Sequence, residues 1–171
     1  SLLLSVRNLK DRDARAVYKN LGTDLINYKR LKMFFHAQEF ETPLNDDELT
    51  AFVRLGTDFT DNYYEIELPL KVTRTGTADA REIWPLENEI DLPFDALFQL
   101  KSTRNQLGID TDLPFSDTLV TDNTTYRITV EGRPELQTVQ TIMIGIRNPE
   151  SIDASSKSVI LWANEMRVTE F

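Results

Sequence analysis

Cysteine is absent from the 171 residues of this sequence, and histidine occurs once, at His36. The absence of cysteine excludes disulfide bonds, thiolate metal sites and cysteine nucleophiles, but it leaves the redox compartment open. One imidazole and no thiolate leave only carboxylates to complete a zinc site. We therefore expect neither a bound metal ion nor a cofactor.

Basic residues are in the minority. The sequence has 19 Lys and Arg against 28 Asp and Glu, which gives a formal net charge of -9 and a pI near 4.7. A negative surface repels the phosphate backbone, so nucleic acid is not an expected partner. The basic run at residues 28–32 is interpreted as a solvated entrance to a strand.

Long hydrophobic runs are missing as well. No apolar run approaches the roughly 20 residues of a membrane helix, and the opening SLLLS is too short for the apolar core of a signal peptide. We expect a segment that does not span the membrane and that forms a single domain over residues 1–171. The sequence starts at Ser1 without an initiator methionine, which we interpret as excision from a much larger protein.

Alternating apolar and polar residues dominate what is present. Residues 51–72 predict a strand, a polar turn and a second strand with one buried face. The residues on the predicted buried face of the second strand are Tyr64, Ile66, Leu68, Leu70 and Val72, and those on its other face are Tyr63, Glu65, Glu67 and Lys71. This pattern is typical of one wall of a β-sandwich.

Further strands are predicted at residues 2–9, 30–38, 125–131, 139–147 and 158–169. In the last of these, one side is predicted to carry Ile160, Trp162, Met166 and Val168. Residues 73–80 are the most linker-like stretch, yet they are too short to separate two domains.

Two short helices are also predicted. The first covers residues 14–21 because Ala14, Val17, Tyr18 and Leu21 have helical spacing, with Asp11 or Asp13 as its N-cap and Gly22 just past its end. The second runs from an Asp91 cap to about Gly108, with Phe94, Leu97, Phe98 and Lys101 on one face.

These elements predict an all-β fold, mainly β with two short helices. About seven or eight strands joined by polar turns favour an antiparallel β-sandwich of jelly-roll type over a doubly wound sheet. The jelly-roll outline is shared with galactose-binding and carbohydrate-binding modules.

Candidate catalytic groups are few. His36 lies in the middle of a predicted strand, which favours a structural role over membership of a Ser-His-Asp triad. Glu65 and Glu67 share a strand face and Glu165 lies on a neighbouring predicted strand, so a glycosidase-like acid pair is an alternative. Acid-rich sequences contain such pairs by chance, and we assign no catalytic residue.

Candidate ligand-binding groups have structural explanations too. The acidic loops at residues 45–48, 58–61 and 110–112 contain calcium-type oxygen ligands, but turn-forming Asx residues explain them equally well. Trp84, Trp162, Tyr63 and Tyr64 are a candidate sugar-stacking platform. We interpret Trp162 as a core residue and Trp84 as part of a loop closure. The ligand-binding residues therefore stay unknown.

Several segments, in the same order along the whole chain, resemble the SprA family. They are SVRNL at residue 5, DARAVYKN at 13, DLINYKRLKMFFHA at 24, FVRLGTD at 52, NYYEIELPL at 62, VQTIMIGIRN at 139 and WANEMRVT at 162. That family is a very large cell-surface protein of gliding motility. A likeness spread from end to end is more specific than any single motif.

The resemblance implies that the parent protein is the outer-membrane β-barrel translocon of the type IX secretion system. This segment would then be a soluble module at the outer membrane or cell surface, with no catalytic residues. Its expected partners are the rest of the barrel protein, accessory secretion subunits or secreted cargo. A second hypothesis is a carbohydrate-binding module of a surface glycan-uptake system, which an exposed aromatic row on a sheet face would favour.

Overall fold

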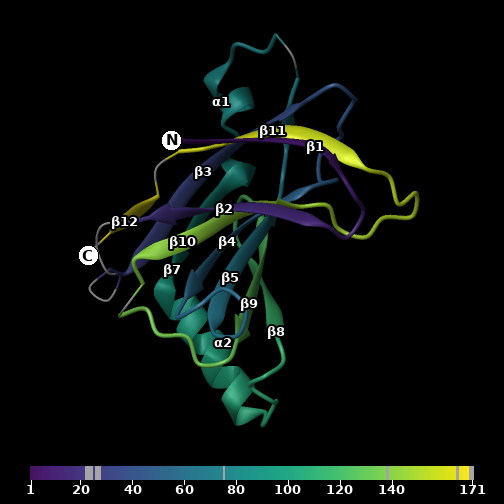
Figure 1. Cartoon of the computed structure of the whole chain (residues 1–171). Helices are drawn as coiled ribbons and strands as arrows, with labels where there is room; N and C mark the ends of the chain where they lie inside the picture. Colours follow the sequence, from purple (N-terminus) through teal and green to yellow (C-terminus); the bar gives the residue numbers. More distant parts are fainter. Residues whose placement is uncertain (22–24, 26–27, 75, 138, 165, 170–171) are drawn as a thin grey trace.

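Two facing β-sheets make up the body of the molecule (Figure 1). The computed structural model describes residues 1–21, 25, 28–74, 76–137, 139–164 and 166–169. Each sheet contains six strands, and two short α helices and one 3-10 turn accompany them in the described residues. The predicted all-β sandwich with two short helices is confirmed, whereas its jelly-roll subtype stays a prediction.

The first sheet has the strand order β1-β11-β3-β12, and β6 and β7 also pair with β3. All of these pairs are antiparallel except β3 with β6. Its strands are β1 (Leu2–Leu9), β3 (Arg30–Glu39), β6 (Val72–Thr73), β7 (Glu89–Pro93), β11 (Lys157–Ala163) and β12 (Arg167–Thr169).

The second sheet has the order β2-β10-β4-β5-β9-β8, with every pair antiparallel. Its strands are β2 (Ala14–Asn20), β4 (Thr50–Gly56), β5 (Tyr63–Pro69), β8 (Phe115–Val120), β9 (Thr125–Glu131) and β10 (Thr141–Arg147). The β4–β5 hairpin confirms the strand, turn and strand predicted within residues 51–72, but the second strand ends at Pro69 and Val72 belongs to β6 of the first sheet.

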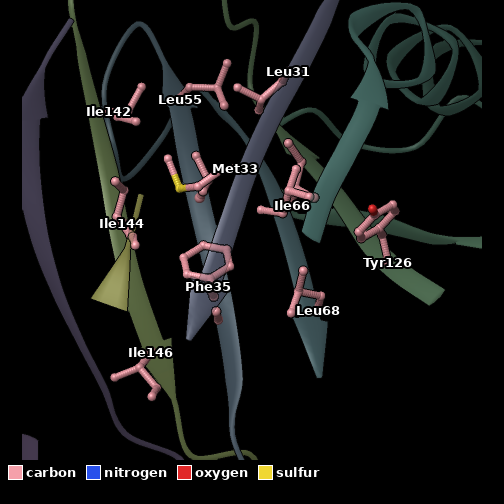
Figure 2. Packing of buried hydrophobic residues seen from close by; sticks show 14 of the residues in the cluster. Leu31, Met33, Phe35, Leu55, Ile66, Leu68, Tyr126, Ile142, Ile144 and Ile146 are labelled. Carbon is pink, nitrogen blue, oxygen red and sulfur yellow. The ribbon is translucent and has the colours of Figure 1, made fainter. Parts of the chain in front are cut away.

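The hydrophobic core fills the space between the sheets. Leu31, Met33 and Phe35 of β3 are at most 1% exposed, and in Figure 2 they lie among side chains of β4, β5 and β10 from the other sheet. Burial of large aliphatic and aromatic side chains on both inner faces is the main force that holds the sheets together.

Residues 14–20 form strand β2, so the predicted first helix is wrong. All seven residues pair with β10, from Ala14 opposite Arg147 to Asn20 opposite Thr141. Asp13 caps no helix; its carboxylate accepts from the backbone N–H of Ala14, while Asp11 accepts from Ser151. Pairing along a whole strand outweighs the helical spacing of a few apolar residues. The predicted helix end at Gly22 lies outside the described residues.

The second predicted helix exists as α2 (Phe94–Gln106), but Asp91 is not its cap. Asp91 lies in β7 and pairs with Arg30, while extended Pro93 precedes the helix and the carbonyl of Lys29 accepts from the N–H of Phe94. The helix ends before Gly108, which has a φ of 69° and suits the left-handed position expected there. In Figure 1, α2 and the four-residue α1 (Ala80–Ile83) lie at opposite ends of the sandwich.

The buried stripe of α2 is rotated from the predicted one. Its buried residues are Phe94, Leu97, Leu100 and Arg104, whereas Phe98 is 46% exposed. The helix packs mainly against β9 of the second sheet.

The predicted strand at 158–169 is two strands, β11 and β12. Val159, Leu161 and Ala163 are the buried face of β11, and Ile160 and Trp162 are on the opposite, half-buried face. Val168 of β12 and Met166, just before that strand, pack against the core. The prediction that Ile160, Trp162, Met166 and Val168 share one side is therefore wrong, because the first two lie opposite the buried face of β11 and the last two pack against the core.

Candidate functional site

The outer face of the second sheet carries a cluster of charges that we call the charged network: Arg54 of β4, Glu65 and Glu67 of β5, and Arg147 of β10. Strand register brings them together, because Arg54 is opposite Glu65 and β10 adjoins β4. The two glutamates are only 5% and 8% exposed. The outer face of this strand is therefore buried as well as its inner face.

Glu65 is the centre of the charged network. One of its oxygens accepts from Nε and Nη2 of Arg54 at 3.0 and 2.9 Å, and Arg147 donates to both oxygens at 3.1 and 3.2 Å. Arg147 also pairs with Glu67 at 2.9 Å, and Thr50 donates to the same carboxylate at 2.6 Å. Each of the four charges thus has at least one partner of opposite sign.

Aromatic rings lie beneath the two arginines. The guanidinium carbon of Arg54 is 3.9 Å from the ring centre of Tyr63, and that of Arg147 is 4.5 Å from the ring centre of Phe52. These cation–π contacts hold the guanidinium planes in place over the sheet. Burial lowers the pKa of Arg147, but the carboxylates of Glu65 and Glu67 outweigh it and raise that pKa above its ordinary value.

A cavity of about 380 Å³ opens beside the charged network. Glu65, Glu67 and Arg147 line it together with Arg127 and the hydroxyl-bearing Thr129. Both glutamates are already ion-paired with arginine in this arrangement. The third predicted acid, Glu165, lies outside the described residues.

The predicted aromatic platform does not form. Tyr63 and Tyr64 are 6% and 2% exposed on opposite faces of β5, and burial raises the pKa of both phenols. Trp84 and Trp162 lie on the outer face of the first sheet instead, and both are half-buried. The interpretation of Trp162 as a core residue is wrong.

The two tryptophans belong to an aromatic patch made of Phe34, His36, Trp84 and Trp162. The ring centre of His36 is 4.8 Å from that of Trp162 and 5.7 Å from that of Trp84, while Phe34 and Trp84 meet edge to face at 6.4 Å. His36 lies within β3, as predicted, and its Nδ1 is 2.8 Å from the carbonyl oxygen of Ile83. Its ring therefore joins α1 to the sheet.

Carboxylates of the acidic loops have partners within the protein. Asp46 accepts from the backbone N–H of Val72, and Asp47 binds Lys71 Nζ at 2.9 Å. Asp58 accepts from three successive backbone N–H groups at residues 60–62, and Asp110 accepts from Asp112. In the described residues, no group of three or more His, Cys, Asp and Glu side chains is arranged to hold a metal ion.

Sequence reasoning missed the arginines of the charged network. Arg54 and Arg147 are ordinary polar residues of two alternating strands, and the sequence gives no sign that β10 lies beside β4. The available signal was the outward position of Arg54, Glu65 and Glu67 in a predicted hairpin, which places opposite charges across a strand pair.

Comparison with known proteins gives one family. A comparison with curated proteins finds no match. None of the helices in the described part of the chain combines the length and apolar character needed to cross a membrane, α2 having 13 residues. The SprA_N family, described as motility related/secretion protein, matches residues 1–171. Because the match covers the whole chain, this protein belongs to the SprA_N family of motility- and secretion-related proteins.

Proposed function

We propose that this chain is a non-catalytic interaction domain of an SprA-like outer-membrane protein that serves type IX secretion and gliding motility. The family match over residues 1–171 carries the proposal. Secretion requires contacts between proteins, so the expected partners are the remainder of the barrel protein, accessory subunits or cargo. The outer membrane or cell surface is the corresponding location.

The arrangement of the acids supports a role without catalysis. A glycosidase needs one carboxylate free to protonate the leaving group and a second free to act on the sugar or on water. Glu65 and Glu67 instead share Arg147, and Glu65 also binds Arg54. Fixed ion pairs on a sheet face stabilise a surface of defined shape.

Deletion of the domain tests the proposal. Residues 1–171 are removed from the parent gene, and secretion of cargo, gliding and co-purification of accessory subunits are measured. We expect secretion and co-purification to fall strongly, while the remaining barrel still reaches the outer membrane. Wild-type secretion together with wild-type co-purification would contradict the proposal.

Glycan binding is a second candidate, and the aromatic patch favours it. Trp84 and Trp162 are half-buried on an outer sheet face, where a sugar ring can reach the exposed part of an indole. Calorimetric titration with a panel of polysaccharides tests it, with Trp84→Ala as the variant. Saturable binding that Trp84→Ala abolishes would support this role, and no binding to any polysaccharide would exclude it.

A further inference from the structure

The outer face of the first sheet combines aromatic rings with positive side chains. Lys32 and Phe34 of β3 lie on this face, because their neighbours along the strand are in the core. Lys32 lies opposite Arg167 of β12, and Phe34 lies opposite Glu89 of β7. The aromatic patch therefore continues along β3 into a group of charged residues.

Three positive side chains lie near Glu89. Burial and the charge of Asp91 raise the pKa of Glu89, whereas the charges of Lys32, Arg167 and Arg81 lower it. Asp91 already has an ion pair of its own, and none of the three cations forms one among the residues that the structure describes. One carboxylate thus faces three cations, on a protein whose formal net charge is -9.

A cavity of about 380 Å³ is lined from both α1 and β3. Its walls include Phe34 and Trp84, whose ring centres are 6.4 Å apart and whose planes meet at 80°. Arg81 lines it from α1, one helical turn before Trp84, whereas the acids of that turn do not line it. Asn164 lines it as well. Its Oδ1 accepts from the backbone N–H of Phe34 at 2.7 Å, which leaves its side-chain N–H groups to donate to a ligand.

We propose that this cavity binds one ring of a polysaccharide made of sugar acids, with the ring packed against Trp84 and its carboxylate on Arg81. The planar guanidinium offers two parallel N–H donors, which match the two oxygens of a carboxylate. The C–H face of a pyranose covers the exposed part of the indole, and the ring of Phe34 borders its edge. Lys32 and Arg167 attract the carboxylates of neighbouring rings. This proposal rests on the glycan-binding role, the second candidate above, and adds the charge of the ligand.

The ring geometry favours sugar acids over other polyanions. Single-stranded nucleic acid stacks successive bases on several accessible rings, whereas Phe34 and Trp84 are nearly perpendicular and form a corner for a single ring. An acidic peptide would satisfy the cations but has no pyranose to cover the indole. The net charge of -9 also weakens any contact that depends on charge alone.

Isothermal titration calorimetry of the 171-residue chain with hexagalacturonate tests the site. The fully methyl-esterified hexamer is the matched ligand without charge. We expect saturable binding of the acid, about tenfold tighter than that of the ester, because one charge-assisted hydrogen-bonded pair contributes about that ratio. Hexamers of glutamate and of thymidylate carry negative charge without sugar acids, and we expect both to bind at least about tenfold more weakly than hexagalacturonate.

Arg81→Gln is the decisive variant, because Arg81 is exposed and its replacement leaves the core intact. We expect the affinity for hexagalacturonate to fall about tenfold, to that of the ester, while binding of the ester is unchanged. Arg133→Gln is the control. It removes the same charge from an exposed position after β9 of the second sheet, and the affinity stays as in the wild type. Glu89→Gln removes the competing carboxylate and tightens binding of the acid about threefold.

Four results would overturn the proposal. Equal affinity for the acid and its ester, with both lost in Trp84→Ala, would reject the role of the cations and leave a module for neutral glycans. Equally tight binding of the glutamate or thymidylate hexamer would show that charge alone is recognised. Undiminished affinity in Arg81→Gln, or unchanged affinity in Glu89→Gln, would place the ligand elsewhere. No binding of hexagalacturonate would reject this site, and the polysaccharide panel described above would then decide on glycan binding by itself.

Discussion

The charged network and helix α2 handle buried charge in opposite ways. On the outer face of the second sheet, Glu65 and Glu67 neutralise Arg54 and Arg147 through five hydrogen-bonded or ion-paired contacts at 2.9 to 3.2 Å. On the helix that packs against β9, Nη1 and Nη2 of Arg104 have no hydrogen-bond partner among the described residues. The network satisfies its buried charges within the protein, whereas α2 keeps a buried guanidinium whose two terminal nitrogens have no hydrogen-bond partner in the described residues.

Glu65→Gln gives the largest expected effect, because it leaves two arginines without their shared partner. We expect the free energy of unfolding to fall by about 3 kcal/mol, at the low end for a buried ion pair since Arg54 and Arg147 are 20% and 26% exposed. Chemical denaturation measures it. The control is Glu150→Gln at an ion pair with both side chains 68% exposed, where the loss stays below about 1 kcal/mol. Equal losses would mean that burial does not matter here.

Gly145→Ala tests the support beneath the network. A Cβ at this position would lie 2.4 Å from Cζ of Phe52 and 2.7 Å from the carbonyl oxygen of Arg15. Phe52 is the ring on which Arg147 rests, so the clash displaces both, and we expect a loss of about 2 kcal/mol in unfolding free energy. Ala16→Ser, at the paired position of β2, is the control and stays near wild type. An unchanged free energy of unfolding in Gly145→Ala would show that the charged network tolerates displacement of Phe52 and Arg147.

Tyr126→Phe probes a neutral buried group close to α2. The Tyr126 hydroxyl donates to the backbone carbonyl of Glu89 and accepts from the backbone N–H of Asp91. A side chain of the second sheet therefore provides hydrogen-bond partners for two backbone groups of β7 in the first sheet. We expect a loss of about 1 to 2 kcal/mol and faster hydrogen exchange at Asp91. Tyr18→Phe is the control, because Tyr18 is 65% exposed. Unchanged exchange at Asp91 would contradict this bridge.

Asp58→Asn gives the smallest expected effect and depends on pH. Hydrogen bonds from the Asn62 side chain and the backbone of residues 60–62 hold the pKa of Asp58 well below its ordinary value of 3.8. A pKa lowered by folding stabilises the protein above pH 3.8, and that stabilisation is lost as the pH falls below it. We expect Asp58→Asn to be less stable than the wild type at pH 7, and the difference in unfolding free energy between the two proteins to shrink steadily as the pH is lowered below 3.8. A difference in unfolding free energy between the wild type and Asp58→Asn that does not change with pH would contradict this.

The alternation of apolar and polar residues along the sequence predicted those strands in which successive side chains are alternately buried and exposed. The hairpin of β4 and β5 and the strands β1, β3 and β9 follow from residues that switch face at every position. Strand β2 was misread because Ala14, Val17 and Tyr18 satisfy helical spacing, and only its partner β10, more than a hundred residues away, decides its conformation. Strands β7 and β8 gave no signal strong enough to be predicted.

The candidate sites were less predictable than the fold. Glu65 and Glu67 were recognised as neighbours, but their arginine partners come from two other strands whose order the sequence does not reveal. Arg104 was missed because charged residues are expected on the solvent side of a helix. Its burial depends on how α2 is rotated against β9, which only the assembled structure defines.

The antiparallel pairing of β1 with β11 has a mechanical consequence. Leu2 lies opposite Ala163, and the pairing then runs inward to Leu9 opposite Lys157. A force that pulls these two strand ends apart acts on the Leu2–Ala163 rung first and breaks the ladder one rung at a time. Loading the strands along their length instead would strain all rungs together. Strand β1 should therefore unzip from β11 at low tension from this end, and the core is opened only when the ladder reaches Val6 and Leu9, which are buried in it.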